Sequence, residues 1–148
     1  MADSRHSRPT AAFPRAATAK PRQPEREAAS LAGHGVVRGH VVVAVNLLRE
    51  RIAEPWTLNT LAEEVHLSRS QLARSFDATV GMSPMAYLRQ MRAERMARLL
   101  ASTDLSIAEA ARSVGWRNQF HASQCFHAAY GVSPTEFRRR HTTPPRIT

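Results

Sequence analysis

The sequence contains a single cysteine, Cys125, and no long uninterrupted apolar run. A lone cysteine excludes a disulfide within the chain and a cysteine-rich zinc site, and it is compatible with a reducing compartment. The most apolar segment, 36–48, is short and is interrupted by Arg38 and His40, which excludes a membrane span there. The first residues lack the apolar core of a secretory signal. We therefore expect a cytoplasmic protein with no membrane partner.

Arrangements suited to catalysis or metal binding are also scarce. The chain has no glycine-rich phosphate loop and no alternation of strands and helices, which argues against an α/β nucleotide-binding fold. His121, Cys125 and His127 lie close in sequence, but no acidic or second cysteine partner stands at zinc-like spacing. No combination of serine, histidine and carboxylate stands out as a nucleophile system. The sequence predicts no enzyme, no metal and no cofactor.

Lysine is almost absent, because 20 of the 21 basic residues are arginine and the other is Lys20. The formal net charge is +9, and residues 41–148 alone hold 14 basic and 9 acidic side chains. A basic folded region favours a polyanionic partner such as DNA, RNA or an anionic membrane surface. Charge alone does not separate these partners from an ordinary solvated surface.

Large apolar side chains are rare in residues 1 to about 35, which are rich in Ala, Pro, Arg and Ser. Such a segment buries too little surface to offset the entropy lost on ordering. The sequence therefore predicts a disordered basic tail over 1–37, a folded domain over 38–141 and a second disordered tail over 142–148.

The folded region contains an internal repeat. Five residues recur 50 positions later, where Phe76, Gly81, Ser83, Pro84 and Tyr87 reappear as Phe126, Gly131, Ser133, Pro134 and Phe137. Four apolar positions recur 49 positions later, where Leu58, Leu61, Ala62 and Val65 reappear as Ile107, Ala110, Ala111 and Val114. A repeated helix, turn, helix and glycine stop is typical of a fold with two helix-turn-helix units.

Capping signals place the helix boundaries. Ser68, Ser106 and Ser133 are each followed three residues later by Gln or Glu, which predicts three capping boxes. Gly81 and Gly131 are expected to end helices in the left-handed conformation. The predicted helices are roughly 38–53, 58–65, 69–79, 84–101, 106–113, 118–129 and 134–140. For the first, the β-branched run 41–43 leaves a strand as the alternative. The expected fold is all-α, with subdomains 38–82 and 103–141 joined by a long linker helix, 83–102.

Helix 69–79 has an apolar stripe that is expected to face the core, formed by Leu72, Phe76 and Val80. The outward face carries Ser70, Ala73 and Arg74. A small residue at 73 permits close approach to DNA, and Arg74 can bind a guanine through two hydrogen bonds. For one isolated helix, an unpartnered polar surface is the simpler interpretation.

Helix 118–129 has the equivalent stripe in Ala122, Phe126 and Tyr130. Its outward face carries Gln119, Phe120, Ser123 and Gln124. Phe120 lies about 200° from Ala122 around the helix, which predicts an exposed ring that can pack on thymine methyl groups. The alternative is that the small Ala122 lets the helix rotate and bury Phe120. Glutamines suit adenine edges, although they are also common on surfaces.

Four residues flank these two faces: Arg69, Gln71, Arg117 and Asn118. We expect them to contact the DNA backbone or the groove edge, with Asn118 also capping its helix. The linker helix of roughly 18 residues spans about 27 Å. Adjacent major-groove faces on straight DNA lie about 34 Å apart. The linker therefore predicts two reading helices on one face of a duplex that bends when both engage.

Residues from about 40 to 140 resemble the DNA-binding domain of AraC/XylS-type bacterial transcription regulators. The resemblance rests on motifs in the expected order, namely Thr57-Leu58 with Leu61-Ala62, 68–76, Arg92 with Leu99-Leu100, 107–116, Phe126, 131–134 and Phe137-Arg138. It implies two helix-turn-helix subdomains on a linker helix that bind successive major grooves. The reading residues it implies are the two outward faces named above.

Four positions depart from the usual pattern of this family: His66, Phe120, Ala122 and Gln124. They lead us to expect that the first unit contributes more of the affinity. The short N-terminal segment is similar to the small stand-alone members, which implies a monomer on double-stranded DNA that acts at promoters in the bacterial nucleoid, with RNA polymerase as a further candidate partner. The alternatives are a non-specific nucleic-acid-binding or architectural protein, and a detached C-terminal piece of a larger regulator.

Overall fold

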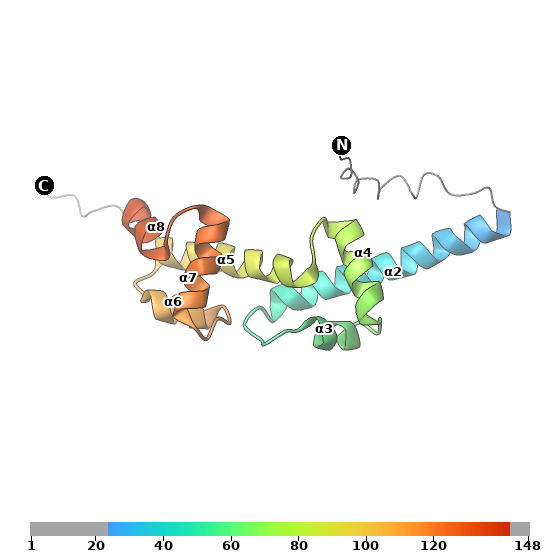
Figure 1. The fold of residues 1–148 in the computed structure, drawn as a ribbon, viewed down its shortest axis with the longest axis horizontal. Coiled ribbons are helices and arrows are strands. Elements are labelled where there is room, and N and C mark those ends of the chain that lie inside the picture. The colour runs from blue at the N-terminus through green and yellow to red at the C-terminus, as the bar shows by residue number, and fades with distance from the viewer. Residues whose placement is uncertain (1–23, 143–148) are drawn as a thin grey trace, which may run out of the picture. The chain divides into compact units, whose positions relative to one another are not determined.

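The computed structural model describes residues 24–142, and every regular element in that range is an α-helix (Figure 1). The helices are α2 (Pro24–Glu50), α3 (Leu58–Glu64), α4 (Arg69–Val80), α5 (Pro84–Ser102), α6 (Ile107–Ser113), α7 (Gln119–Tyr130) and α8 (Pro134–His141). The predicted all-α class is confirmed over these residues, and six of the seven helices have nearly the predicted bounds. None of the described helices is both long and apolar enough to cross a membrane.

The first helix, α2, is longer than predicted. It begins at Pro24 instead of residue 38 and ends at Glu50 instead of residue 53. Proline needs no hydrogen bond in the first turn of a helix, and the Glu and Ala residues that follow are good helix formers. The expectation of disorder is therefore corrected for residues 24–37. The rest of that tail, and the C-terminal residues from 143, lie outside the described residues.

The strand alternative for residues 41–43 is wrong, because the segment lies within α2. Val41, Ala44 and Leu48 are buried at positions i, i+3 and i+7, which is helical spacing. Val42 and Val43 are exposed on the other side of the helix. Burial of one face therefore outweighs the β preference of the valine run.

Two of the three predicted capping boxes are confirmed. Ser68 and Gln71 exchange hydrogen bonds at the start of α4, and Ser106 and Glu109 do so at the start of α6. At α8 the Ser133 hydroxyl accepts from the Glu136 N–H, but the Glu136 carboxylate binds Arg139 and Arg140 instead of returning the bond. The prediction of a box there is wrong because arginines one turn ahead compete for the carboxylate.

A capping box that was not predicted stands at the start of α3. Thr57 accepts from the Thr60 N–H at 3.1 Å, and the Thr60 hydroxyl accepts from the Thr57 N–H at 3.0 Å. A threonine at the third position performs the role that Gln or Glu has in the usual motif. The search for Gln or Glu alone could not find it.

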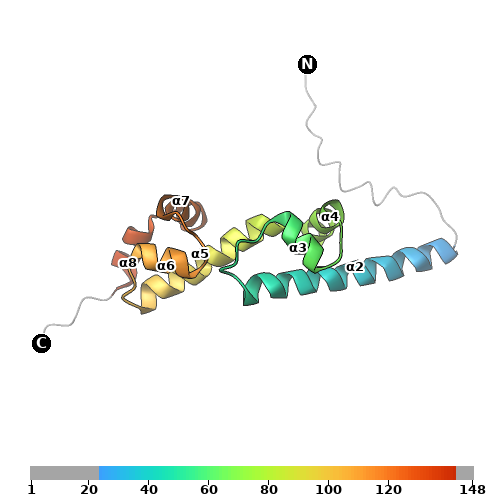
Figure 2. The same ribbon diagram turned by 90° about the horizontal axis from the view of Figure 1, so that it is seen from below.

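The helix α5 runs from α4 to the group formed by α6, α7 and α8 (Figures 1 and 2). Its residues enter two separate hydrophobic cores. Its first half contributes Leu88 to a core with α2, α3 and α4, in which Phe76 is fully buried. Its second half contributes Met96 and Leu100 to a core with α6 and α7, in which Phe126 is fully buried. Each helix-turn-helix unit, α3–α4 or α6–α7, is therefore held in place by its own half of one shared helix.

Both units turn through a residue with positive φ. His66 has φ +58° between α3 and α4, and Gly115 has φ +103° at the equivalent place between α6 and α7. After the second helix of each unit, Gly81 and Gly131 adopt the left-handed conformation, as predicted. The two units therefore share the same sequence of helix, positive-φ turn, helix and left-handed glycine.

Candidate nucleic-acid interface

The exposed face of α4 carries the residues that the sequence singled out. Leu72 and Phe76 are buried, which fixes the rotation of the helix about its own axis. On the other side Ser70 and Arg74 are exposed, and Ala73 is half-buried. The geometry therefore leaves Ser70 and Arg74 accessible on one surface, with the small Ala73 between them.

The guanidinium of Arg74 has no partner among the residues that the structure describes. Within the described residues it makes no hydrogen bond or ion pair through its guanidinium, unlike Arg51, which pairs with Glu64 at 3.1 Å. An uncommitted guanidinium keeps all of its donors available for a planar acceptor edge. Arg69, one turn earlier on α4, is also exposed.

The exposed face of α7 differs from that of α4 in chemistry. Phe120 is 72% exposed, whereas Ala122 and Phe126 are fully buried. The helix therefore does not rotate to bury Phe120, and the predicted exposure of the ring is confirmed. Gln119 and Gln124 are exposed, and Ser123 is half-buried beside them. The surface combines one apolar ring with two exposed amides.

Two of the expected flanking residues are partly committed to helix caps. The Asn118 side chain accepts from the backbone N–H groups of Phe120 and His121, at 2.8 and 3.0 Å. The Gln71 side chain accepts from the Ser68 N–H at 3.1 Å. In both residues the carbonyl oxygen is occupied, which leaves the amide NH₂ group free to donate to a phosphate. Arg117, in the turn before α7, is exposed.

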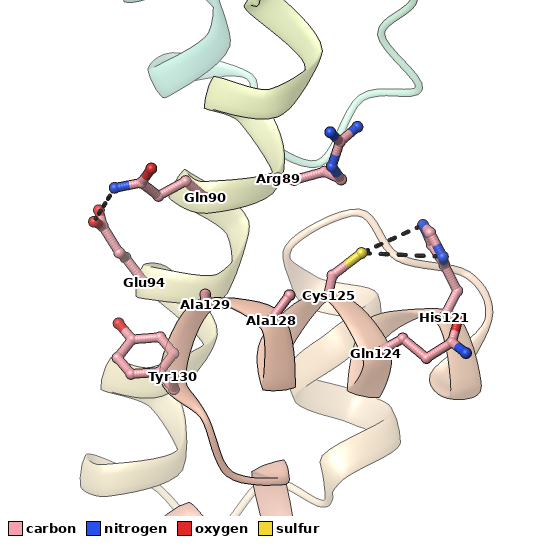
Figure 3. A pocket seen from close by; sticks show the side chains of 9 residues that line it. All are labelled: Arg89, Gln90, Glu94, His121, Gln124, Cys125, Ala128, Ala129 and Tyr130. Carbon is pink, nitrogen blue, oxygen red and sulfur yellow. Dashed lines mark hydrogen bonds between the residues drawn. The ribbon is translucent and has the colours of Figure 1, made fainter. Parts of the chain in front are cut away.

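A groove of about 640 Å³ lies between α5 and α7 (Figure 3). In that view Gln90, Glu94 and Tyr130 gather at one side, while Arg89, Cys125 and His121 lie at the other. The Cys125 Sγ atom lies 3.6 Å from His121 Nε2. Burial raises the pKa of the Cys125 thiol, and the arginines at 89 and 92 oppose this effect. The thiol on α7 is therefore held in its neutral form.

Arg89 is a candidate that the sequence analysis did not identify. It is exposed on α5 and lines the groove beside α7, so its positive charge is next to the second candidate surface. The available signal was the arginine spacing in the linker helix, where residues 89, 92, 95 and 98 recur every three positions. No group of three or more histidine, cysteine or acidic side chains in the described part of the chain is placed to hold a metal.

The chain matches a family model described as a helix-turn-helix domain over residues 61–140, which is more than half of its length. It is similar to a putative AraC-like transcription regulator of Streptomyces lividans, with 36% identity over 104 residues, 70% of this chain and 34% of that protein. It is also similar to the HTH-type transcriptional regulator MtrA of Neisseria gonorrhoeae, with 33% identity over 101 residues, 68% of this chain and 33% of that protein. The chain thus spans about a third of the length of these relatives.

Two solved structures are similar to most of the helical array. The C-terminal domain of AraT, a response regulator from Geobacillus stearothermophilus, aligns with a TM-score of 0.70 and 32% identity over 74% of this chain and 91% of that one. The DNA-binding domain of AdpA, a global transcriptional factor solved in complex with a target DNA, aligns with a TM-score of 0.66 and 28% identity over 68% of this chain and 90% of that one.

Proposed function

This chain belongs to the AraC-type helix-turn-helix family, and on that premise we propose that it is a sequence-specific transcriptional regulator that reads two adjacent major-groove segments of double-stranded DNA with α4 and α7. The observation that carries the proposal is that two copies of one scaffold expose two different sets of side chains. A purely structural repeat has no need to place an exposed arginine on one copy and an exposed phenylalanine on the other.

In the first unit, Arg74 is the principal base-reading residue. Its guanidinium binds the O6 and N7 acceptors of a guanine, which is a pairing worth about 1–3 kcal/mol of discrimination. Ala73 lets the helix backbone approach the bases, and Ser70 donates or accepts at a neighbouring base. Arg69 contacts the phosphate backbone and fixes the register of the helix in the groove.

In the second unit, Phe120 packs against a thymine methyl group. The exposed ring loses unfavourable contact with water when it reaches this apolar surface, so the contact favours A·T over G·C pairs. Gln119 and Gln124 supply the two-pronged amide that suits an adenine edge, and Ser123 is compatible with any base. The free amide of Asn118 and the guanidinium of Arg117 bind phosphates.

The linker α5 sets the separation of the two reading helices. Its 19 residues correspond to about 28 Å of helix. Adjacent major-groove faces are about 34 Å apart on straight DNA, so simultaneous engagement requires the duplex to bend toward the protein. We expect one monomer on each asymmetric site, with RNA polymerase as its second partner when it acts as an activator.

The proposal is tested by selecting bound sites from random double-stranded DNA with the full chain. We expect an asymmetric motif with two unlike halves. Arg74→Ala should relax a guanine position in one half and leave the other half unchanged, whereas Phe120→Ala should relax a thymine position in the other half only. A charge-matched control is Arg95→Ala, which removes an exposed arginine of α5 outside both reading helices.

The same selection separates the regulator from a general nucleic-acid binder, which the net positive charge would also support. A general binder would yield no motif, would lose affinity equally at all sequences in Arg74→Ala and Arg95→Ala, and would be displaced by excess random DNA. That result would overturn the proposed function.

A further inference from the structure

Arg92 lies at the middle of α5 and is only 8% exposed. Its Nε donates to the Ile52 carbonyl at 2.9 Å, and its Nη2 donates to the Glu54 carbonyl at 2.7 Å. Both carbonyls belong to the segment that follows the C-terminus of α2, where unpaired oxygens and the helix dipole favour a cation. Burial lowers the pKa of Arg92 from its usual value, but an arginine keeps its charge in such a site. Arg92 therefore ties the linker helix to the first unit.

Gly115 approaches this same arginine from the second unit. A Cβ atom at residue 115 would lie 2.7 Å from Arg92 Nη2, and 2.9 Å from both the Cα and the carbonyl oxygen of Ala53. Two of these three atoms are backbone, so the clash cannot be relieved by rotation of one flexible side chain. The turn of the second unit thus rests directly on the backbone of the first unit and on the arginine that holds it.

The positive φ of +103° favours glycine at residue 115, but the local turn is only part of the reason for it. At the equivalent place in the first unit, His66 adopts a positive φ of +58° with a full side chain. At the other two glycines with positive φ, Gly81 and Gly131, an added Cβ would meet no atom within 4 Å, so their role is confined to the local backbone. Gly115 is distinguished from them by the contact across the two units.

We propose that Arg92 and Gly115 are positioning residues that hold α4 and α7 at one mutual orientation, so that the protein selects DNA sites by the spacing of their two halves as well as by their bases. This inference rests on the proposed two-site reading. Each base pair added between the halves rotates one half by about 34° and moves it about 3.4 Å along the duplex. A rigid junction cannot follow such a step, whereas a loose one can.

The first test measures affinity for the selected site with base pairs added to or removed from its centre. For the unaltered chain we expect a sharp optimum, with affinity falling at least about fivefold for one inserted pair, as expected when the base contacts of one half are lost. Gly115→Ala should broaden or shift this profile. The matched control is Gly81→Ala, which imposes similar backbone strain at φ +90° without a clash and should leave the optimum in place.

The second test needs no DNA. Spin labels are attached to two exposed positions, Glu63→Cys in α3 and Arg112→Cys in α6, in a Cys125→Ser background. The distribution of distances between the two labels is then measured. We expect one narrow distribution, which broadens in Gly115→Ala and in Arg92→Lys but not in Gly81→Ala. Circular dichroism of each variant establishes that the helices are still formed.

The outcomes separate the inference from the proposed function. If the selected motif has two halves and Gly115→Ala retains both the spacing optimum and the narrow distance distribution, the positioning role is refuted. The same holds if Gly115→Ala and Gly81→Ala broaden the distribution equally. If no motif is selected but the label distances respond as expected, the proposed two-site reading fails while the rigid junction remains.

Discussion

The two helix-turn-helix units differ least where they are buried and most where they are exposed. Each packs one phenylalanine, Phe76 or Phe126, in the centre of its own core, and each ends its second helix at a left-handed glycine. Their outward faces differ in their principal side chains, with an exposed Arg74 on α4 and an exposed Phe120 on α7. The comparison teaches that the buried positions of the repeat are set by packing, whereas the exposed positions are not, and it is the exposed positions that we propose to differ in base preference.

A second difference lies in how each core is closed. Arg92 binds two carbonyls beyond α2 from a buried position, at 2.9 and 2.7 Å. Arg138 of α8 binds the Leu100 and Thr103 carbonyls at the end of α5, at 3.3 and 3.4 Å and partly exposed. Both arginines bind carbonyls at a helix C-terminus, but the bonds of Arg92 are buried or part-buried, whereas those of Arg138 are part-buried or exposed. The junction between the units is therefore held more firmly than the C-terminal end of the domain.

The largest expected effects on stability come from truncating the central phenylalanine of each core separately. Phe76→Ala and Phe126→Ala should each lower the free energy of unfolding by about 3–5 kcal/mol, since each ring is fully buried. Because the cores share only α5, hydrogen exchange should report lost protection in α3 and α4 for the first variant and in α6 and α7 for the second. Equal loss of protection across all helices in either variant would show one cooperative core instead of two.

The scaffold that the two units share could be predicted from the sequence because it depends on residue spacing within single helices. The stripe of Leu72 and Phe76, the Ser68 cap and the glycine at 81 each follow from spacing along a single helix. The start of α2 was missed because disorder was inferred from low apolar content, whereas Pro24 and the residues after it favour a helix on local grounds. Composition measures what a segment can bury, which is a different property from its helix propensity.

The junction could not be predicted, because it depends on residues 38 or more positions apart meeting in space. Nothing in the sequence around Arg92 shows that its partners are the carbonyls of Ile52 and Glu54. The exposure of Phe120 was predicted, since helical periodicity alone places it opposite Ala122. Its partner on DNA remains a prediction, because periodicity gives the direction of a side chain and not what it touches.

The two capping arginines give the next largest effect. Arg92→Met should cost about 3 kcal/mol of stability, because two short, charge-assisted hydrogen bonds are lost and a buried carbonyl is left unpaired. Arg138→Met should cost about 1 kcal/mol or less, because its bonds are longer and water can replace them. Urea denaturation of both variants measures the difference. A larger loss for Arg138→Met would mean that the C-terminal end, and not the junction, limits stability.

The N-terminal capping boxes of α3 and α6 should respond differently to acid. The hydrogen bond from the Ser106 backbone N–H holds the pKa of Glu109 below its usual value of 4.5. The carboxylate therefore stabilises α6 above that value, and the contribution is lost as the pH falls through the lowered pKa. The box of α3 pairs Thr57 with Thr60 and has no group that titrates in this range.

Hydrogen exchange followed from pH 6 downward, to about 3, should thus show α6 losing its first-turn protection before α3 does. Glu109→Gln supplies the control, since an amide can still accept from the Ser106 N–H but does not titrate. In that variant the loss in α6 should no longer depend on pH. Equal acid sensitivity of α3 and α6 in the unaltered chain would contradict the assignment.

The smallest expected effect compares the turns directly. His66 has φ +58°, a conformation that costs an L-residue roughly 1–2 kcal/mol and glycine almost nothing. Glycine also gains entropy in the unfolded chain, about 0.4–1 kcal/mol, so His66→Gly should raise stability by less than about 1 kcal/mol. Ala78→Gly, at an exposed position inside α4, carries the same entropy change without relief of strain and should lower stability by about 0.5–1 kcal/mol.

Opposite signs for the two variants in urea denaturation would locate strain at the turn of the first unit, which tolerates a side chain where Gly115 cannot. Equal losses would mean that His66 is not strained and that the two turns differ only in their contacts.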